Sequence, residues 1–208
     1  MKGLLLKDWY MMKKYCRYYF FVCIVFTALS LASEGNMFFV FYPCLLCGMI
    51  PVNLLGYDER SRWTEYVGVF PYTKAQIVSA KYLIGLFTQI TMLTVICITQ
   101  GLKMAIEGNL ILKEFFVLMM LLLIMASVAS SLTLPFIFKY GVEKGRAAYY
   151  IMIGVVCAGS IIATTIFKES AENRIQPNGI LPVACLVGIG IYALSWYLSI
   201  IFYKKREQ

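Results

Sequence analysis

The sequence predicts an all-α, polytopic membrane protein with six transmembrane helices, forming a single transmembrane domain over residues 1–208. Hydrophobic residues make up 61% of the chain and charged residues only 14%. The charges fall almost entirely between six long apolar runs, and none of these runs contains Asp, Glu, Lys or Arg. A bilayer core of about 30 Å requires roughly 20 apolar residues per helix. The predicted spans are residues 18–33, 37–56, 82–102, 115–138, 147–167 and 180–203.

The distribution of Lys and Arg predicts the orientation of these spans, because connections that stay in the cytoplasm retain positive charge. If the N-terminus is inside, the inner segments hold fifteen of the nineteen Lys and Arg residues and the outer segments hold four. We therefore expect both termini to be cytoplasmic. The net charge of +8 is then a topology signal that suits an anionic lipid leaflet, and no nucleic-acid partner is expected.

The first element, residues 1–17, is predicted to be a helix that lies in the inner membrane interface. Leu5, Trp9, Met12 and Cys16 share one helical stripe, while the basic residues lie away from it. The alternative is that this segment is only the positive flank of the first span. A cleavable signal peptide is a further alternative, but the charges disfavour it, because cleavage would leave five spans and reverse the end that they place inside.

Polar residues within the spans allow two interpretations. Ser and Thr in the fourth and fifth spans can let neighbouring helices approach closely. Alternatively, some polar residues line a substrate path, and the candidates are Asn53, Gln89, Ser127, Ser131 and Thr164. Pro43 and Pro51 predict an irregular second span.

Missing residue types exclude several classes of function. The chain has no histidine, so a Ser/His or Cys/His nucleophile pair, a histidine proton relay and the H-E-x-x-H zinc motif are excluded. No Walker A motif is present, and no carboxylate lies within a span. Cys44 and Cys47 form a C-x-x-C inside an apolar run, where they are interpreted as small apolar residues rather than a redox or metal site. We expect no enzyme activity, no metal site and no bound cofactor in this chain.

The longest polar connection between two spans, residues 58–81, is the candidate functional segment. Trp63, Tyr66, Val67 and Phe70 follow the spacing of one apolar helical face, which predicts a short helix lying against the membrane. The opposite face of this helix would carry Asp58, Ser61 and Glu65.

A second helix is predicted directly after it. Pro71 ends the first helix, and Thr73 with Gln76 forms a capping box, so a new helix should begin at Lys74 and continue into the third span. Such a bent arm could transmit force from a cytoplasmic partner to the membrane. A surface helix that only anchors the connection is the alternative.

The segment DERSRWTEYVGVFPYTKAQIVSAKYL resembles the region after the second span in bacterial ABC type 2 permeases. The order of spans, the short N-terminal helix and the chain length are also similar to that family. The matching positions are Asp58, Glu59, Trp63, Pro71, Thr73, Lys74, Ile77, Val78, Lys81 and Tyr82.

This resemblance implies the transmembrane subunit of an ATP-binding cassette exporter in a bacterial cytoplasmic membrane. Two separate ATPase subunits would bind ATP and Mg²⁺, and the permease would pair with an identical or similar chain. Residues 58–69 would form the coupling helix. Its ATPase-contacting residues would be Asp58, Glu59, Ser61, Arg62, Trp63, Glu65 and Tyr66. A second cytoplasmic contact would involve Lys139, Glu143, Lys144 and Arg146.

Similar short permeases export amphipathic or antimicrobial peptides or other hydrophobic compounds, and an uncharged path suits such substrates. Two other classes remain open at this point. One is a channel or scaffold that works without an ATPase, although no T-V-G-Y-G filter signature is present. The other is an intramembrane enzyme, which the lack of histidine and of buried carboxylates within the spans disfavours.

Overall fold

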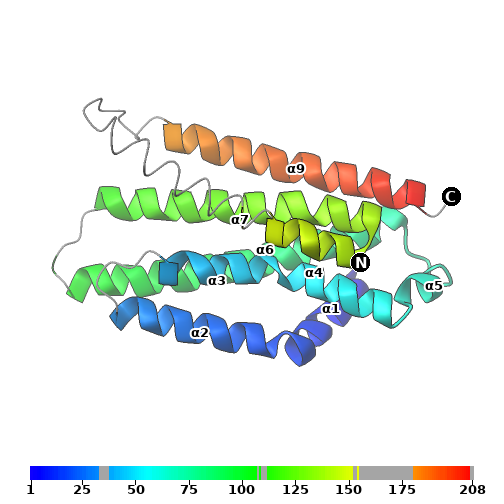
Figure 1. Cartoon of the computed structure of the whole chain (residues 1–208), viewed down its shortest axis with the longest axis horizontal. Helices are drawn as coiled ribbons and strands as arrows, with labels where there is room; N and C mark the ends of the chain where they lie inside the picture. Colours follow the sequence, from blue (N-terminus) through cyan, green and yellow to red (C-terminus); the bar gives the residue numbers. More distant parts are fainter. Residues whose placement is uncertain (33–37, 107, 109–111, 152–153, 155–179, 207–208) are drawn as a thin grey trace.

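The helices of the chain pack side by side in an elongated bundle (Figure 1). The computed structural model describes residues 1–208 except 33–37, 107, 109–111, 152–153, 155–179 and 207–208. Every secondary-structure element named in the described part is an α-helix. These elements are α1 (Lys2–Tyr15), α2 (Arg17–Ala32), α3 (Phe38–Gly48), α4 (Ile50–Arg60), α5 (Trp63–Val67), α6 (Lys74–Ile106), α7 (Leu112–Tyr140) and α9 (Ile180–Arg206), and residues 142–151 are also helical.

Several of these helices are long and apolar enough to cross a bilayer. In the described residues they are Phe38–Arg60, Lys74–Ile106, Phe115–Tyr140 and Pro182–Lys205, which correspond to the predicted second, third, fourth and sixth spans. Helices α1 and α2, bent by 65° relative to each other, count as one more candidate if the pair is taken as a single span, and α2 corresponds to the predicted first span. The predicted fifth span, 147–167, lies mostly outside the described residues, so the count of six stays a prediction.

The second span is irregular, as its prolines indicate. Pro43 lies inside α3, Met49 separates α3 from α4, and Pro51 occupies the first turn of α4. Proline lacks the amide hydrogen that a continuous helix needs, but it is tolerated in a first helical turn. The span is therefore built from two short helices.

Helix α6 contains 33 residues, so at 1.5 Å per residue it is about 50 Å long. It begins at Lys74, as predicted, because a capping box is present. The Gln76 amide donates a hydrogen bond to Thr73 Oγ1 (3.3 Å), and the Thr73 amide donates one to Gln76 Oε1 (3.2 Å). Residues Lys74–Lys81 extend this helix beyond the predicted span, which starts at residue 82. They join the polar connection rigidly to the bundle.

Helix α7 ends at Tyr140, and the next residue, Gly141, has a left-handed φ of 92° that a residue with a side chain rarely adopts. The chain then turns back into the helix at 142–151. This turn is tight, because a Cβ atom at Gly145 would lie 3.1 Å from Ile137 Cβ of α7. Helices α7 and α9 run in the same direction and pack against each other (Figure 1).

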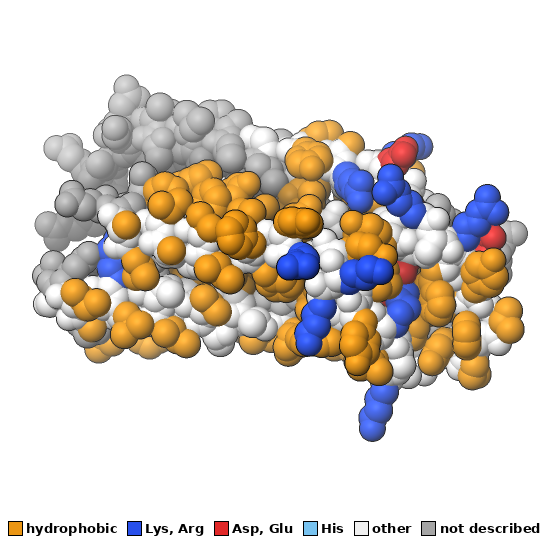
Figure 2. Space-filling view, turned by 90° about the horizontal axis from the view of Figure 1, so that it is seen from below, with side chains coloured by type: hydrophobic (Ala, Val, Ile, Leu, Met, Phe, Trp, Pro, Cys, Tyr) orange, Lys and Arg blue, Asp and Glu red, His pale blue; other side chains and the backbone are white. Residues whose placement is uncertain are grey.

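Most charged side chains gather at one end of the bundle. This charged end consists of α1, α5, the C-terminal ends of α4, α7 and α9, and the N-terminal end of α6 (Figure 1). In Figure 2 most of the visible Lys and Arg side chains lie over this end, and apolar side chains cover much of the rest of the face. An apolar surface of this kind suits contact with lipid.

Candidate functional site at the charged end

A cluster of four charged side chains, three of them buried, joins three helices at the charged end. Lys81 Nζ of α6 lies 2.7 Å from Asp8 Oδ1 of α1 and 2.6 Å from Asp58 Oδ2 of α4. Lys7 Nζ lies 2.7 Å from Asp58 Oδ1 and 3.5 Å from Asp8 Oδ1. The side chains of Lys81, Asp8 and Asp58 are 3%, 2% and 6% exposed, respectively. Two positive and two negative charges balance, so the cluster can be buried without an uncompensated charge.

The same cluster reaches the short helix α5 and the loop that follows it. Lys7 Nζ lies 4.2 Å from the centre of the Trp63 ring, a cation–π geometry that holds the start of α5 against α1. The start of α1 also approaches the loop before α6 closely, because a Cβ atom at Gly3 would lie 2.9 Å from the Tyr72 hydroxyl. Helix α1 therefore packs against both ends of the connection between α4 and α6.

Tyr82, which follows Lys81 in α6, packs this helix against α9. Its hydroxyl forms hydrogen bonds with Ser195 Oγ (2.8 Å) and Ser199 Oγ (2.7 Å), and its ring stacks on Trp196 with a centroid distance of 5.4 Å. The Trp196 indole donates a hydrogen bond to Ser79 Oγ (3.0 Å). Two adjacent residues, Lys81 and Tyr82, thus connect the start of α6 to α1, α4 and α9. A displacement of the polar connection would be passed to all of these helices.

The predicted exposed face of the coupling segment needs one correction. Asp58 does not lie on it: this residue is 4% exposed and turns inward to Lys7 and Lys81. Burial of its carboxylate is possible because both lysines neutralise it. Ser61 and Glu65, the other two residues assigned to that face, are exposed.

The predicted single helix from Asp58 to Val69 is also wrong in its bounds. Asp58 belongs to the end of α4, and Arg62 interrupts the chain with a left-handed φ of 51° before α5 begins. A side chain at such a φ is uncommon and costs about 1–2 kcal/mol relative to the right-handed conformation. Glu59, Arg60 and Arg62 are exposed at this bend.

The predicted apolar face of the segment is only partly buried. Val67 is 4% exposed, whereas Tyr66 and Phe70 are 61% and 48% exposed. Trp63 is half-buried and stacks on Phe70 with ring centroids 5.8 Å apart. The aromatic side chains of α5 thus leave a substantial apolar surface uncovered beside the exposed Glu65.

The second predicted contact, the turn after α7, lies beside the end of α4. The Val142 amide donates a hydrogen bond to Glu59 Oε2 (3.3 Å), and Arg146 Nη2 donates one to Asn53 Oδ1 (3.4 Å). A polar pocket of about 480 Å³ opens between the two segments. Its lining includes Gly56, Tyr57, Glu59, Arg60, Val142, Glu143 and Arg146. The structure therefore brings the two predicted cytoplasmic contacts together.

The two lysines of that second contact do not line the pocket. Lys139 Nζ lies 4.9 Å and 5.2 Å from the ring centres of Tyr140 and Phe202, so it packs on aromatic groups of α7 and α9. Lys144 is exposed, as is Glu143.

The candidate path residues in the described part fall into two groups: serines whose hydroxyls bond within their own helix, and amide side chains whose nitrogen atom lacks a hydrogen-bond partner. Ser127 and Ser131 donate hydrogen bonds to carbonyls of their own helix, at 2.9 and 3.0 Å, which is a packing arrangement. Asn53 Nδ2 and Gln89 Nε2 are buried, and neither has a hydrogen-bond partner. Thr164 lies outside the described residues.

Sequence reasoning missed Lys7, Asp8 and the buried role of Lys81. The signal that could have revealed this cluster is Asp8, an acidic residue on the apolar side of the first helix. Asp8 lies four residues after Leu4 and four before Met12, and all three are buried. Met12 and Cys16 of the predicted stripe are buried, but in its first half Leu4 and Asp8 are buried in place of Leu5 and Trp9, which pairs Asp8 with Lys81 of α6.

These features define a class of protein, a membrane-embedded helical bundle with an ion-paired charged end. The model of the family described as ABC-2 family transporter protein matches residues 3–204, so the chain belongs to this family. Membership identifies it as a membrane permease of an ABC transporter, a type of subunit that associates with ABC ATPases. No curated protein and no solved structure matches the chain with significant similarity.

Proposed function

We propose that the chain is the transmembrane subunit of an ATP-binding cassette exporter that moves amphipathic or antimicrobial peptides, or other hydrophobic compounds, out of a bacterial cell. Two such permease chains would associate with two ATPase subunits in the cytoplasmic membrane. Both termini and the whole charged end would face the cytoplasm. ATP and Mg²⁺ would bind only in the ATPase subunits.

The observation that carries this proposal is the ion cluster of Lys7, Asp8, Asp58 and Lys81. Lys7 of this cluster contacts Trp63 of α5, and Asp58 of α4 pairs with both Lys7 and Lys81. The cluster thus connects α5, through α1 and α4, to the first turns of α6. An ATPase that binds the exposed side of α5 would therefore act on a connection that cannot bend separately from the bundle. ATPase closure would move α4 and α6 together.

The exposed contact residues would be Tyr66 and Glu65 of α5, supported by Arg62 and by the polar pocket between Glu59 and Glu143. Tyr66 offers a large, half-apolar side chain, which is typical of residues that dominate a protein interface. Ser127 and Ser131 pack between helices, so Asn53 and Gln89 are the stronger candidates for the path.

Co-purification and transport test this proposal. The chain would be expressed together with a candidate ABC ATPase from the same organism, purified in mild detergent and assayed for ATP-driven uptake of a labelled amphipathic peptide into inside-out vesicles. Tyr66→Ala should weaken ATPase binding about tenfold or more, because truncating a central interface aromatic typically loses at least 1–2 kcal/mol. Leu112→Ala is the matched control, since Leu112 is equally exposed (62%) but lies at the opposite end of the bundle.

A negative result would favour a different class. If no ATPase is recovered with the chain, and Tyr66→Ala and Glu65→Ala leave peptide uptake unchanged, the exporter proposal fails. A channel or scaffold that works without an ATPase would then be the better description.

A further inference from the structure

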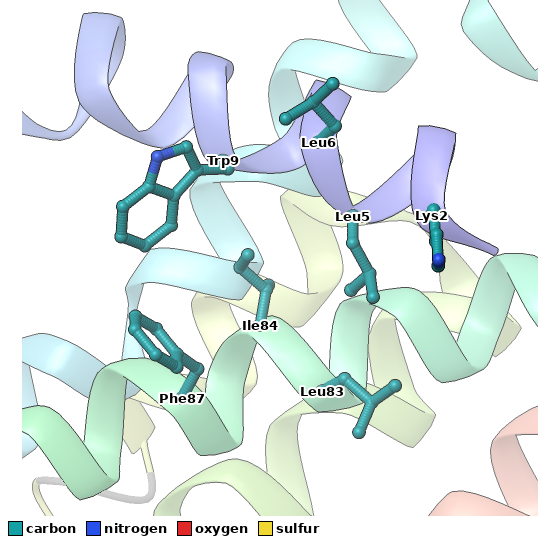
Figure 3. A pocket seen from close by; sticks show the side chains of 7 residues that line it. All are labelled: Lys2, Leu5, Leu6, Trp9, Leu83, Ile84 and Phe87. Atoms are coloured by element: carbon teal, nitrogen blue, oxygen red, sulfur yellow. The ribbon is translucent and has the colours of Figure 1, made fainter.

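An apolar groove runs between α1 and α6 at the charged end (Figure 3). Its volume is about 480 Å³, which lies within the usual range for sites that hold a small molecule. In Figure 3 Leu5 and Ile84 point into the space between the two helices, with Trp9 and Phe87 at one end and Lys2 at the other. The lining residues are Lys2, Leu5, Leu6, Trp9, Leu83, Ile84 and Phe87.

The groove exists because α1 is held to α6 at one level and diverges from it elsewhere. The Asp8–Lys81 ion pair (2.7 Å) fixes the two helices at the cluster. The edge-to-face contact of Trp9 with Phe87, at a centroid distance of 5.3 Å, closes one end. Leu6 and Phe87 are still 56% and 50% exposed, so the groove is an open apolar surface.

The position of the groove along α6 indicates which environment covers it. Leu83, Ile84 and Phe87 follow Lys81 directly, at the start of the apolar part of this helix. In a membrane-spanning chain, this is the level at which lipid headgroups give way to acyl chains. An apolar groove at this level suits a hydrocarbon chain.

The charge around the groove selects the headgroup. Lys2 is the charged residue of the lining, and it is exposed at the mouth. Lys13 Nζ lies 5.2 Å from the centre of the Trp9 ring, so a second ammonium group lies near the closed end. Ammonium groups next to an apolar slot are complementary to a lipid phosphate and its acyl chain.

We propose that this groove binds an anionic phospholipid, with one acyl chain between Leu5 and Ile84 and the headgroup phosphate at Lys2. Bound lipid would fill the open space between α1 and α6 and so stabilise the contact on which the ion cluster depends. The proposal requires only that the chain spans a membrane. It does not depend on an ATPase or on the transported substrate.

Quenching of Trp9 fluorescence by brominated lipid tests this site. The full-length chain with Trp63→Phe and Trp196→Phe, which leaves Trp9 as its tryptophan, would be reconstituted in phosphatidylcholine vesicles. These would contain equal small fractions of either brominated phosphatidylglycerol or brominated phosphatidylcholine. Quenching should be stronger with the brominated phosphatidylglycerol. Lys2→Ala should reduce this preference about fivefold, the effect expected of one basic residue near an anionic surface.

Lys14→Ala is the matched control, because Lys14 lies on the same helix, is exposed and does not line the groove. Native mass spectrometry of the chain with all its tryptophans provides a second measurement, in which Lys2→Ala but not Lys14→Ala should lose retained phosphatidylglycerol. Equal quenching by the two lipids, or equal losses in both variants, would overturn the proposal in favour of unselective surrounding lipid. Absence of quenching by either lipid would overturn it in favour of a protein cover, such as a second copy of the chain.

Discussion

Asp8, Asp58 and Lys81 are the residues on which the charged end depends most. Each is almost fully buried, so its charge is stabilised by its ion partners rather than by water. A complete buried cluster adds little net stability compared with apolar residues of the same size, but an incomplete cluster leaves a buried charge without compensation. The balance of charges therefore matters more than the presence of any single one.

Lys81→Met should destabilise the protein by about 3–5 kcal/mol, because it leaves Asp8 and Asp58 with only Lys7 between them. The double variant Lys81→Met with Asp8→Asn restores the balance and retains the 2.7 Å pair of Lys7 with Asp58. It should recover at least about 1 kcal/mol of the loss. Thermal unfolding of the chain in detergent measures both effects.

Lys113→Met is the control for this pair of variants, since Lys113 is exposed at the opposite end of the bundle. It should change stability by less than about 0.5 kcal/mol. A double variant that is less stable than Lys81→Met alone would show that charge balance does not govern the cluster.

Asp58 shows where prediction of single residues from sequence reached its limit. Its position on a helical wheel placed it with exposed polar residues, but two lysines, 51 residues before it and at the start of α6, turn it inward. Such partners lie far away along the chain, and periodicity within one segment carries no information about them. Asp8 was detectable in principle, because an acid within an apolar stripe requires a buried partner.

Among the elements, the start of α6 was predicted to the residue because its signal is local. A capping box places both members within four positions, so no distant contact decides it. The break at Arg62 was not predicted, since residues with side chains rarely adopt a left-handed φ and nothing in the local sequence indicates it. Arg62 therefore divides a segment that periodicity alone joins into one helix.

Thr73→Ala should weaken the start of α6 by about 1 kcal/mol, the usual loss when a capping side chain is removed. The variant loses the 3.3 Å hydrogen bond that the Gln76 amide donates to Thr73 Oγ1. Thr73→Ser keeps a hydroxyl and is the matched control. Hydrogen exchange of the amides of residues 74–77 should rise in Thr73→Ala only, and equal exchange in both variants would contradict the capping role.

The turn between α7 and the helix at 142–151 gives a second test at this scale. Gly145→Ala would press a methyl group against Ile137, whose Cβ would lie 3.1 Å away, and should destabilise the protein by about 1–3 kcal/mol through overpacking. Gly101→Ala is the control, because a Cβ atom there meets nothing within 4 Å. Circular dichroism during heating would measure both, and equal unfolding temperatures would show that the turn can relax.

For the whole molecule, composition was enough to predict a membrane-embedded helical bundle. Four described stretches are long and apolar enough to cross a bilayer, and they match four of the six predicted spans. The first span is bent by 65° at its junction with α1, which a linear count of apolar residues does not reveal. Membrane crossing depends on apolar length, whereas a bend depends on how α1 packs against α6.

The orientation of the bundle can be tested by labelling with a membrane-impermeant maleimide. Tyr66→Cys and Leu112→Cys introduce thiols at positions that are 61% and 62% exposed, at the charged end and the opposite end of the bundle. In inside-out vesicles only the Tyr66→Cys thiol should react, and in right-side-out vesicles only the Leu112→Cys thiol. The reverse pattern would mean that both termini lie outside. The unaltered chain measures background labelling of its own cysteines.

The ion pair of Asp8 with Lys81 also has a consequence for biosynthesis. These residues are 73 positions apart, so at 5–20 residues per second Lys81 leaves the ribosome roughly 4–15 s after Asp8. During that interval the Asp8 carboxylate of the first helix is without its ion partner Lys81. The first helix can take its final position against α6 only after the third predicted span has been synthesised. Nascent chains truncated before Lys81 should therefore leave the first helix loosely held, and chains that extend beyond it should lock this helix in place.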